Sequence, residues 1–248
     1  MLFRSEFAYV AEPSAPPPSH LGIEAWPKET NGEQKLHGEQ VRGDPLSLDE
    51  LRFRLDSLNE RIGAVGGSTL SLGQLMACRL YTGAMFTKYN LVLRSVGMEH
   101  FRKQMQALCL GNIYPTTIHA INAAVTRLAV ISKATTFFRG ISNANLPDAF
   151  WQTNEHGWRG GIDFAFASCT TTYDLAMQYS AVGSTSCLWE IQPTTFFKPA
   201  DLKEISMYPF ENEFLFPPRT ALEVKRDRVQ IFNGKSVLVL EVMPCYRF

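Results

Sequence analysis

Hydrophobic side chains recur at steps of three and four residues through the part of the chain that follows Pro45. In the segment 46–62, LSLDELRFRLDSLNERI, leucine and isoleucine keep this spacing, and Asp49 and Glu50 fall in the first turn. Side chains at these steps share one face of a helix, and acids near its N-terminus favour the helix dipole. Similar periodicity continues through LGQLMACRLYTGAMFTKYNLVLRSV, FRKQMQALCL and IHAINAAVTRLAVIS. The pattern predicts a helical lobe over residues 46–132.

From residue 133 onward the pattern changes to short apolar runs rich in Phe, Val, Ile and Thr. These runs are ATTFFRGI, IDFAFASCTTT, CLWEIQ, EFLFPP, ALEVKR, RVQIF and SVLVLEVM, with one short helix-like segment, YDLAMQY. β-Branched and aromatic residues between Gly, Pro and Asn are typical of strands. Helices followed by strands predict an α+β fold with a β-rich lobe over residues 133–248, not a doubly wound sheet.

The first 45 residues have a different composition. They contain AEPSAPPPS and then NGEQKLHGEQVRGD, which are rich in proline and polar residues and have little to bury. Such composition cannot offset the entropy of ordering. We expect a disordered or flexible tail over residues 1–45.

Composition argues against several classes of function. The 248-residue chain is 45% hydrophobic, enough for a sizeable core, and has 24 basic and 24 acidic residues. Without a dense basic run, no nucleic-acid partner is expected. The opening MLFRSEFAYV has too short an apolar run for a signal peptide, and no apolar stretch reaches membrane-spanning length, so we expect no membrane association and a cytoplasmic or otherwise intracellular location. We also expect a monomer, although the sequence carries no signal for oligomeric state. The five cysteines lack CxxC spacing, so no metal is expected.

Familiar catalytic motifs are absent from the sequence. There is no GxGxxG fingerprint and no GxxxxGK[ST] loop, and the five histidines lie outside any nucleophile-elbow context. His156, in the loop NEHGWRGG, is interpreted as a solvated loop histidine.

The strands instead carry one cation, one hydroxyl cluster and one pair of acids, in that order. Arg139 follows an apolar run and precedes Gly140, where a bare backbone allows a ligand to approach closely. Thr170–Thr172 end the run DFAFASCTTT. Glu211 and Glu213 begin the last segment, ENEFLFPP.

The two acids have two possible explanations. In an extended segment, residues i and i+2 project to the same face, so Glu211 and Glu213 would repel each other unless a cation visits them. Alternatively, they are two solvated acids at a strand end, which is a common arrangement.

Taken together, these motifs resemble the mono-ADP-ribosyltransferase family of the arginine, Ser-Thr-Ser, Glu-x-Glu class. The resemblance spans roughly the last 170 residues, and the most specific match is EISMYPFENEFLFPP, around the glutamate pair. FFRG is similar to the arginine motif of the family. RLYTGAMFTKYNLVLR is similar to its helical-lobe signature, here Tyr81, Thr82, Tyr89, Asn90, Leu93 and Arg94. The resemblance implies a β-rich core of two sheets with the helical lobe packed on it, in a single domain over residues 46–248.

A literal Ser-Thr-Ser occurs at residues 184–186, in a loop before CLWEIQ. The hydroxyl motif of the family ends a strand and leads into a short helix about 40 residues before the glutamates. Thr170–Thr172 meet both conditions, with Phe164 and Phe166 on the strand before them. Threonine keeps the hydroxyl donor and acceptor, so we interpret these threonines as the motif.

The resemblance implies NAD+ as co-substrate and residue roles to match. Arg139 would hold a phosphate, and Gly140 would offer backbone groups to the nicotinamide amide. Thr170 would hydrogen-bond near the nicotinamide ribose and help to orient Glu213, and Thr172 would contact NAD+. Glu213 would stabilise the oxocarbenium-like state as nicotinamide leaves. Glu211 would bind and deprotonate an arginine of a protein acceptor.

Three functions remain open at this point. The chain is an arginine-specific ADP-ribosyltransferase, an NAD+ glycohydrolase on the same scaffold, or a catalytically impaired descendant that binds a nucleotide or a protein. The third follows from the missing Ser-Thr-Ser at the expected place.

Overall fold

The computed structural model describes residues 43, 45–96, 99–142, 146–180 and 185–245. The tail predicted for residues 1–45 lies outside them, apart from Gly43 and Pro45. The chain divides into two compact units. The first comprises Met1–Ile131 and Ala200–Phe210, and the second comprises Ser132–Pro199 and Glu211–Phe248.

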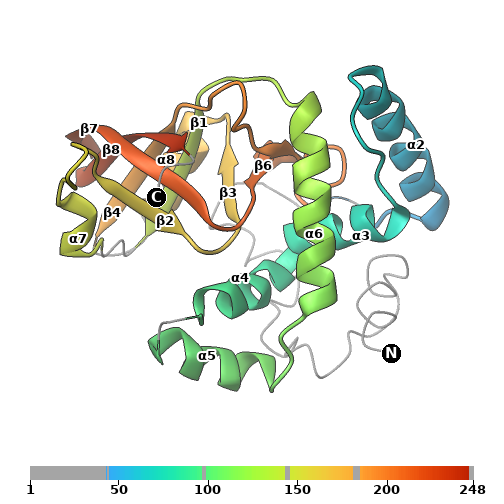
Figure 1. Ribbon diagram of the computed structural model, residues 1–248, viewed down its shortest axis with the longest axis horizontal. Coiled ribbons are helices and arrows are strands. Elements are labelled where there is room, and N and C mark those ends of the chain that lie inside the picture. The colour runs from blue at the N-terminus through green and yellow to red at the C-terminus, as the bar shows by residue number, and fades with distance from the viewer. Residues whose placement is uncertain (1–42, 44, 97–98, 143–145, 181–184, 246–248) are drawn as a thin grey trace. The chain divides into compact units, whose positions relative to one another are not determined.

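The first unit is helical, as its periodicity predicts. Ser47 caps the helix Leu48–Ala64 (α2). Its backbone N–H donates to the Glu50 carboxylate, and its hydroxyl accepts from the backbone N–H of Glu50, which together form a capping box. None of the helices in the described residues has the length and apolar character needed to cross a membrane. The elements of this first unit (Figure 1) are α2 Leu48–Ala64, α3 Leu72–Leu80, η4 Tyr81–Met85, α4 Phe86–Arg94, α5 Glu99–Cys109, α6 Pro115–Leu128, η5 Ala129–Ile131 and the short strand β5 Ala200–Asp201.

The helical periodicity of residues 72–96 is interrupted at η4. This five-residue π-helical turn contains Gly83 with non-helical dihedrals, φ −95° and ψ −168°. Inside it, the Thr82 hydroxyl donates to the carbonyl oxygen of Arg79 at 2.8 Å and accepts from the backbone N–H of Met207 at 2.9 Å. The irregular turn therefore joins the helices to the segment 200–210.

A buried guanidinium makes the same connection. Arg79 is 2% exposed, and its Nη1 donates to the carbonyl oxygens of Ile205 at 3.0 Å and Ser206 at 3.2 Å. A buried charge is tolerated only where hydrogen bonds satisfy it. Segment 200–210 thus belongs to the helical unit although it lies far along the sequence.

The second unit is built on a mixed sheet, which confirms the α+β class. Its strands lie in the order β2-β7-β8-β4-β1-β3-β6, all antiparallel to their neighbours except the parallel pair β4–β8. The strands are β1 Phe137–Ser142, β2 Gly160–Asp163, β3 Ala167–Thr170, β4 Ser186–Ile191, β6 Glu213–Phe216, β7 Thr220–Phe232 and β8 Lys235–Cys245. The helices of this unit are α7 Asp148–Trp151 and α8 Tyr173–Ser180, and η6 Pro209–Glu211 leads into β6.

Strands β1 and β3 are neighbours in the sheet, but only one residue pair joins them. Strand β1 pairs with β4 along its whole length but with β3 only at Phe138↔Thr170. The sheet therefore consists of two groups of strands, β2-β7-β8-β4-β1 and β3-β6, which are joined only at this residue pair. Beyond Phe138, the edge of β1 that faces β3 has no further strand pair among the described residues.

The run IDFAFASCTTT forms two strands and not the one that was predicted. Strand β2 pairs with β7, whereas β3 pairs with β6, so the chain changes partners between them. The turn is held by Asp163, whose carboxylate accepts from the backbone N–H of Ala165 at 3.1 Å. Phe164 and Phe166 therefore lie between the strands and not on the strand before Thr170.

The segments ALEVKR and RVQIF, predicted as separate strands, belong to the one strand β7. A register shift between Val224 and Arg226 lets β7 pair with β8 throughout.

Alternating side chains of the sheet form two cores. Trp189 packs in the larger cluster with Phe137, Phe150 and Phe216, whereas its neighbour Leu188 packs in the smaller one. The smaller cluster is formed with Ala176 and Met177 of α8 and with Val237 and Val239 of β8. Helix α8 therefore covers one face of the sheet.

Candidate active site

The Glu213 carboxylate lies at the first residue of β6, opposite Thr170 in the β3–β6 pair. The residue is 7% exposed. The hydroxyl of Ser168 donates to Glu213 Oε1 at 3.1 Å. A buried carboxylate needs such donors, so β3 supplies the hydroxyl that orients this acid.

Sequence reasoning did not single out Ser168, whose hydroxyl contacts the Glu213 carboxylate. Ser168 and Thr170 are two apart on β3 and so project to the same face of the strand. The strand alternation was the available signal, but the run of three threonines drew attention to residues 170–172.

Thr170 binds the backbone of the glutamate segment. Its hydroxyl donates to the carbonyl oxygen of Glu211 at 2.7 Å and accepts from the backbone N–H of Thr172 at 3.1 Å. The Thr172 hydroxyl accepts from the Asn212 amide at 3.4 Å. The structure therefore brings both predicted threonines to the glutamate pair, on its backbone and on the side chain between the two acids.

Glu211 does not continue the strand of Glu213. It ends the turn η6, and Asn212 between the two acids has φ +46°. The two acids are therefore not same-face neighbours on an extended strand, as the i, i+2 argument assumed.

A tyrosine of α8 holds the Glu211 carboxylate. The hydroxyl of Tyr179 donates to Glu211 Oε1 at 2.6 Å. Burial raises the pKa of Glu211, and the hydrogen bond from Tyr179 opposes this rise. The pKa of Glu211 is therefore raised by the loss of hydration and not by repulsion from Glu213.

Arg139 contacts the same strand from the β1 side. Its Nη1 donates to the carbonyl oxygen of Ser168 at 2.6 Å, and its Nη2 lies 3.8 Å from Asp163 Oδ2. The buried Nε of Arg139 has no hydrogen-bond partner among the described residues. The guanidinium thus fixes the backbone that carries Ser168 and keeps further donor capacity.

Close packing against α8 accounts for a glycine at position 140. A Cβ at this position would lie 2.0 Å from the carbonyl oxygen of Ala176 and 2.6 Å from the backbone nitrogen of Ser180. The bare backbone expected to admit a ligand therefore admits α8 on this side.

The literal Ser-Thr-Ser is partly outside the described residues, which exclude Ser184. Its last residue, Ser186, begins β4 and pairs with Ser142 of β1 and Val237 of β8. No cluster of His, Cys, Asp and Glu in the described part of the chain could hold a metal ion.

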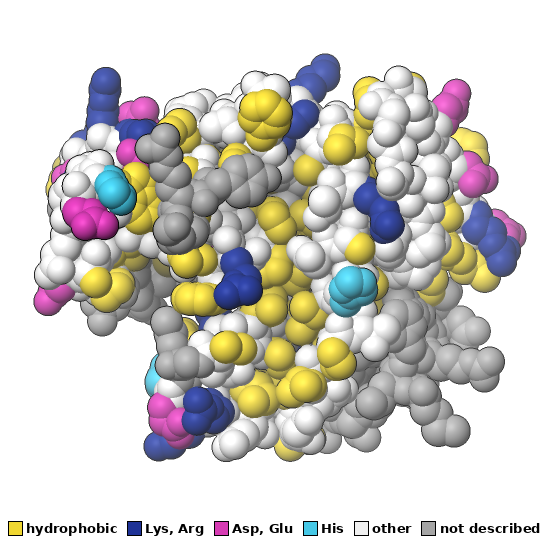
Figure 2. Space-filling model, viewed as in Figure 1, with side chains coloured by type: hydrophobic (Ala, Val, Ile, Leu, Met, Phe, Trp, Pro, Cys, Tyr) yellow, Lys and Arg dark blue, Asp and Glu magenta, His cyan; other side chains and the backbone are white. Residues whose placement is uncertain are grey.

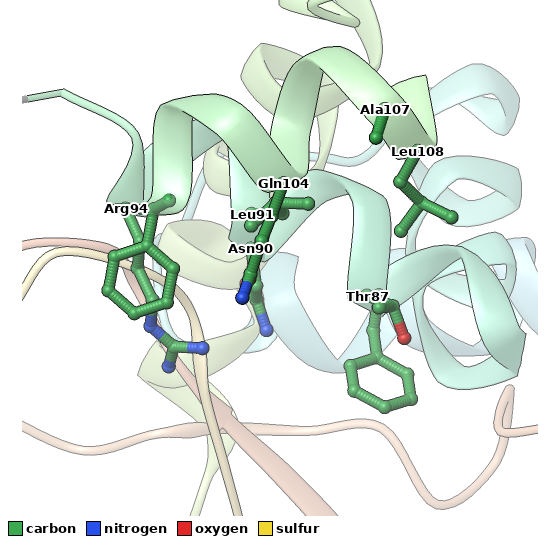
Figure 3. Close-up of a pocket in the computed structure, with 9 residues that line it drawn as sticks. Thr87, Asn90, Leu91, Arg94, Gln104, Ala107 and Leu108 are labelled. Carbon is green, nitrogen blue, oxygen red and sulfur yellow. The ribbon is translucent and has the colours of Figure 1, made fainter. Parts of the chain in front are cut away.

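The helical unit has a pocket of its own between α4 and α5. Its volume is about 460 Å³, and side chains from both helices line it (Figure 3). The lining includes Asn90 and Arg94 of the helical-lobe signature. Figure 2 shows hydrophobic side chains gathered over these two helices, in keeping with the lining residues Phe86, Leu91, Phe101, Ala107 and Leu108.

Several solved structures that match this fold are described as ADP-ribosyltransferases. The Vis toxin of Vibrio splendidus matches with a TM-score of 0.51 and 15% identity over 84% of this chain and 90% of that one. HopU1 of Pseudomonas syringae pv. Tomato DC3000 matches with a TM-score of 0.54 and 19% identity over 82% and 90%. Plx2a, a toxin of Paenibacillus larvae, matches with a TM-score of 0.51 and 14% identity over 80% and 96%. No protein-family model and no curated protein sequence matches the chain.

Proposed function

Because the chain has the mono-ADP-ribosyltransferase fold, we propose that it transfers ADP-ribose from NAD+ to arginine side chains of a protein acceptor and releases nicotinamide. A common fold does not establish an activity, so the proposal depends on the site.

The observation that carries it is the arrangement of the two glutamates. Glu213 accepts from Ser168 on β3, and Glu211 accepts from Tyr179 on α8. Two neighbouring acids are thus held by different elements, one by a serine hydroxyl of β3 and the other by a tyrosine hydroxyl of α8. Acids separated in this way can take different roles in one reaction.

Glu213 is the acid suited to the first step. When the bond between ribose and nicotinamide breaks, positive charge develops on the ribose, and a fixed carboxylate stabilises that charge more in the transition state than in the ground state. The Ser168 hydroxyl keeps Glu213 oriented without a change of conformation during the reaction. This hydroxyl also weakens the argument for an impaired descendant, which rested on a missing serine.

Glu211 is the acid suited to the acceptor. A carboxylate can bind a guanidinium by paired hydrogen bonds and take a proton from it. The Vis toxin has been solved in complex with agmatine, a small guanidinium compound. That complex and the Glu-x-Glu spacing both support arginine as the acceptor here.

Arg139, Gly140, Thr170 and Thr172 are proposed to contact NAD+, with no metal taking part. Arg139 carries a planar guanidinium whose N–H groups suit a phosphate, and its side chain is partly exposed. We further propose that residues 46–248 act as one catalytic domain, and that the protein works as an intracellular monomer.

The test is incubation of the protein with NAD+ labelled in its adenosine part, together with arginine-rich proteins or agmatine. Free nicotinamide, free ADP-ribose and labelled acceptor are measured separately. Label on arginine supports the transferase. Nicotinamide with ADP-ribose alone identifies a glycohydrolase, and NAD+ binding without nicotinamide release identifies a non-catalytic protein.

A further inference from the structure

The contact between Tyr179 and Glu211 joins two elements that are distant in sequence. Tyr179 lies in the last turn of α8, and Glu211 ends η6. Their oxygens are 2.6 Å apart, a short distance of the kind found where a hydroxyl donates to a charged carboxylate. Both residues belong to the sheet-containing unit, so the contact lies within one compact body.

The packing of α8 fixes where Tyr179 can be. Ala176 and Met177 are buried against the sheet. The backbone of Gly140 on β1 approaches this helix so closely that a Cβ there would lie 2.9 Å from Cβ of Tyr179. The tyrosine therefore extends from a helix seated directly on β1, which limits its movement.

From this geometry we infer that Tyr179 is a positioning residue that aims the Glu211 carboxylate at the acceptor and keeps it ready to take a proton. The inference rests on the proposed function and adds to it a residue that determines whether arginine or water captures the ribosyl cation.

The step that depends on this contact is the second half of the transfer. Nicotinamide leaves with the electron pair of the glycosidic bond. A guanidinium nitrogen then forms a bond to C1 of the ribose, and its proton passes to Glu211 and later to water. A carboxylate turned away from the guanidinium would leave the first half intact and allow water to take the ribosyl centre.

The charge of Glu211 depends on the same hydrogen bond. Burial raises the pKa of this acid, and the Tyr179 hydroxyl lowers it. The other charged groups on the surrounding elements are Glu213 on β6, Arg139 on β1 and Asp174 on α8. None of these three is hydrogen-bonded to the Glu211 carboxylate in the described part of the chain. Loss of the hydroxyl should therefore raise the pKa of Glu211 further, which makes the base less available at neutral pH.

Tyr179→Phe tests the inference because it removes the hydroxyl and keeps the ring. The matched control is Tyr173→Phe on the same helix, whose hydroxyl donates to Gln230 at 3.0 Å. In the full-length protein, the ratio of labelled agmatine to free ADP-ribose should fall about tenfold in Tyr179→Phe, the effect of losing one hydrogen bond to a charged group. The acidic limb of the pH profile for transfer should move to higher pH. Tyr173→Phe should match the wild type in both measurements.

Each outcome is decisive. If the wild type labels agmatine and Tyr179→Phe keeps the wild-type ratio and pH profile, the inference is overturned while the proposed function stands. If both tyrosine variants lose transfer equally, α8 has only a structural role and the inference is again overturned. If the wild type labels no agmatine, whether or not it releases nicotinamide, the proposed transfer to arginine fails and the inference fails with it.

Discussion

Glutamine at position 213 keeps the size of the side chain at the start of β6 and removes its charge. The Ser168 hydroxyl still has an oxygen to which it can donate. We expect Glu213→Gln to reduce nicotinamide release by about 100-fold or more, since electrostatic stabilisation of the transition state is lost. NAD+ affinity by calorimetry and the melting temperature should stay near the wild-type values. Near-normal turnover in this variant would remove Glu213 from the mechanism.

Ser168 and Thr170 donate hydrogen bonds to different groups, so their substitutions should have different effects. Ser168→Ala removes a donor to the Glu213 carboxylate, so kcat for nicotinamide release should fall about tenfold. Thr170→Val removes a donor to the backbone of Glu211 and keeps the branched shape, so transfer to arginine should suffer more than nicotinamide release. Steady-state kinetics with both products measured distinguishes the two effects. The opposite ranking would return the hydroxyl role to Thr170.

Glu211 should make stability depend on pH. Burial raises the pKa of this acid in the folded protein above the ordinary value of 4.5, so the folded state holds its proton more tightly than the unfolded state. That contribution is fully present below pH 4.5 and is lost as the pH rises through the folded pKa. Glutamine does not titrate, so the stability of Glu211→Gln lacks this dependence on pH. The melting temperature of the variant relative to wild type should therefore increase from about pH 4.5 upward, and a constant difference between pH 4 and 7 would contradict this.

Single residues were predictable from sequence where a local pattern carried the information. Glu211 and Glu213 were singled out because ENE stands within a specific longer match. Ser168 and Tyr179 were not, because their contacts join positions 45 and 32 residues apart in the sequence. Gly140 was found for a different reason from the one that the structure gives, since only the packed helix shows what occupies the space beside it.

Helix α8 packs closely on β1 at Gly140, so a larger residue at this position should displace the helix. Gly140→Ala would place a methyl group 2.0 Å from the carbonyl oxygen of Ala176, so the helix must move. We expect destabilisation of about 2–3 kcal/mol, typical of overpacking. Because Tyr179 moves with α8, transfer to arginine should fall more than NAD+ binding. Gly161→Ala is a suitable control, since its added Cβ would lie 3.2 Å from an atom of the Phe150 ring, a side chain and not backbone.

Elements with strong local signals were predicted well, and their breaks were not. The helices follow the 3.6-residue periodicity, and the strands follow the runs rich in β-branched and aromatic residues. Ser47 with Glu50 forms the capping box that starts α2. The π-helical turn at Gly83 and the turn after Asp163 depend on tertiary partners, namely Met207 for the first and the separate strands β6 and β7 for the second. Periodicity contains no information about such partners.

The folded molecule should keep four of its five thiols unreactive. All five cysteines are free, and four of them are buried. Burial raises the pKa of Cys187 to about 12 and that of Cys169 even more, so their thiolates are scarce at neutral pH. A thiol reagent at pH 8 should label Cys245 first and the other four only on unfolding. Mass spectrometry of partly labelled protein checks this, and rapid labelling of Cys169 would contradict the packing of β3.

The hydrogen bonds of Arg79 determine when the helical unit can be completed during synthesis. Their acceptors are the carbonyl groups of Ile205 and Ser206, which leave the ribosome long after the helices. Until then the guanidinium has to remain hydrated, because burial without these acceptors costs free energy. The helices therefore await a segment made after most of the sheet-containing unit has been translated. The chain cannot mature as two bodies folding one after the other, and a nascent chain arrested before residue 205 would carry an incomplete helical unit.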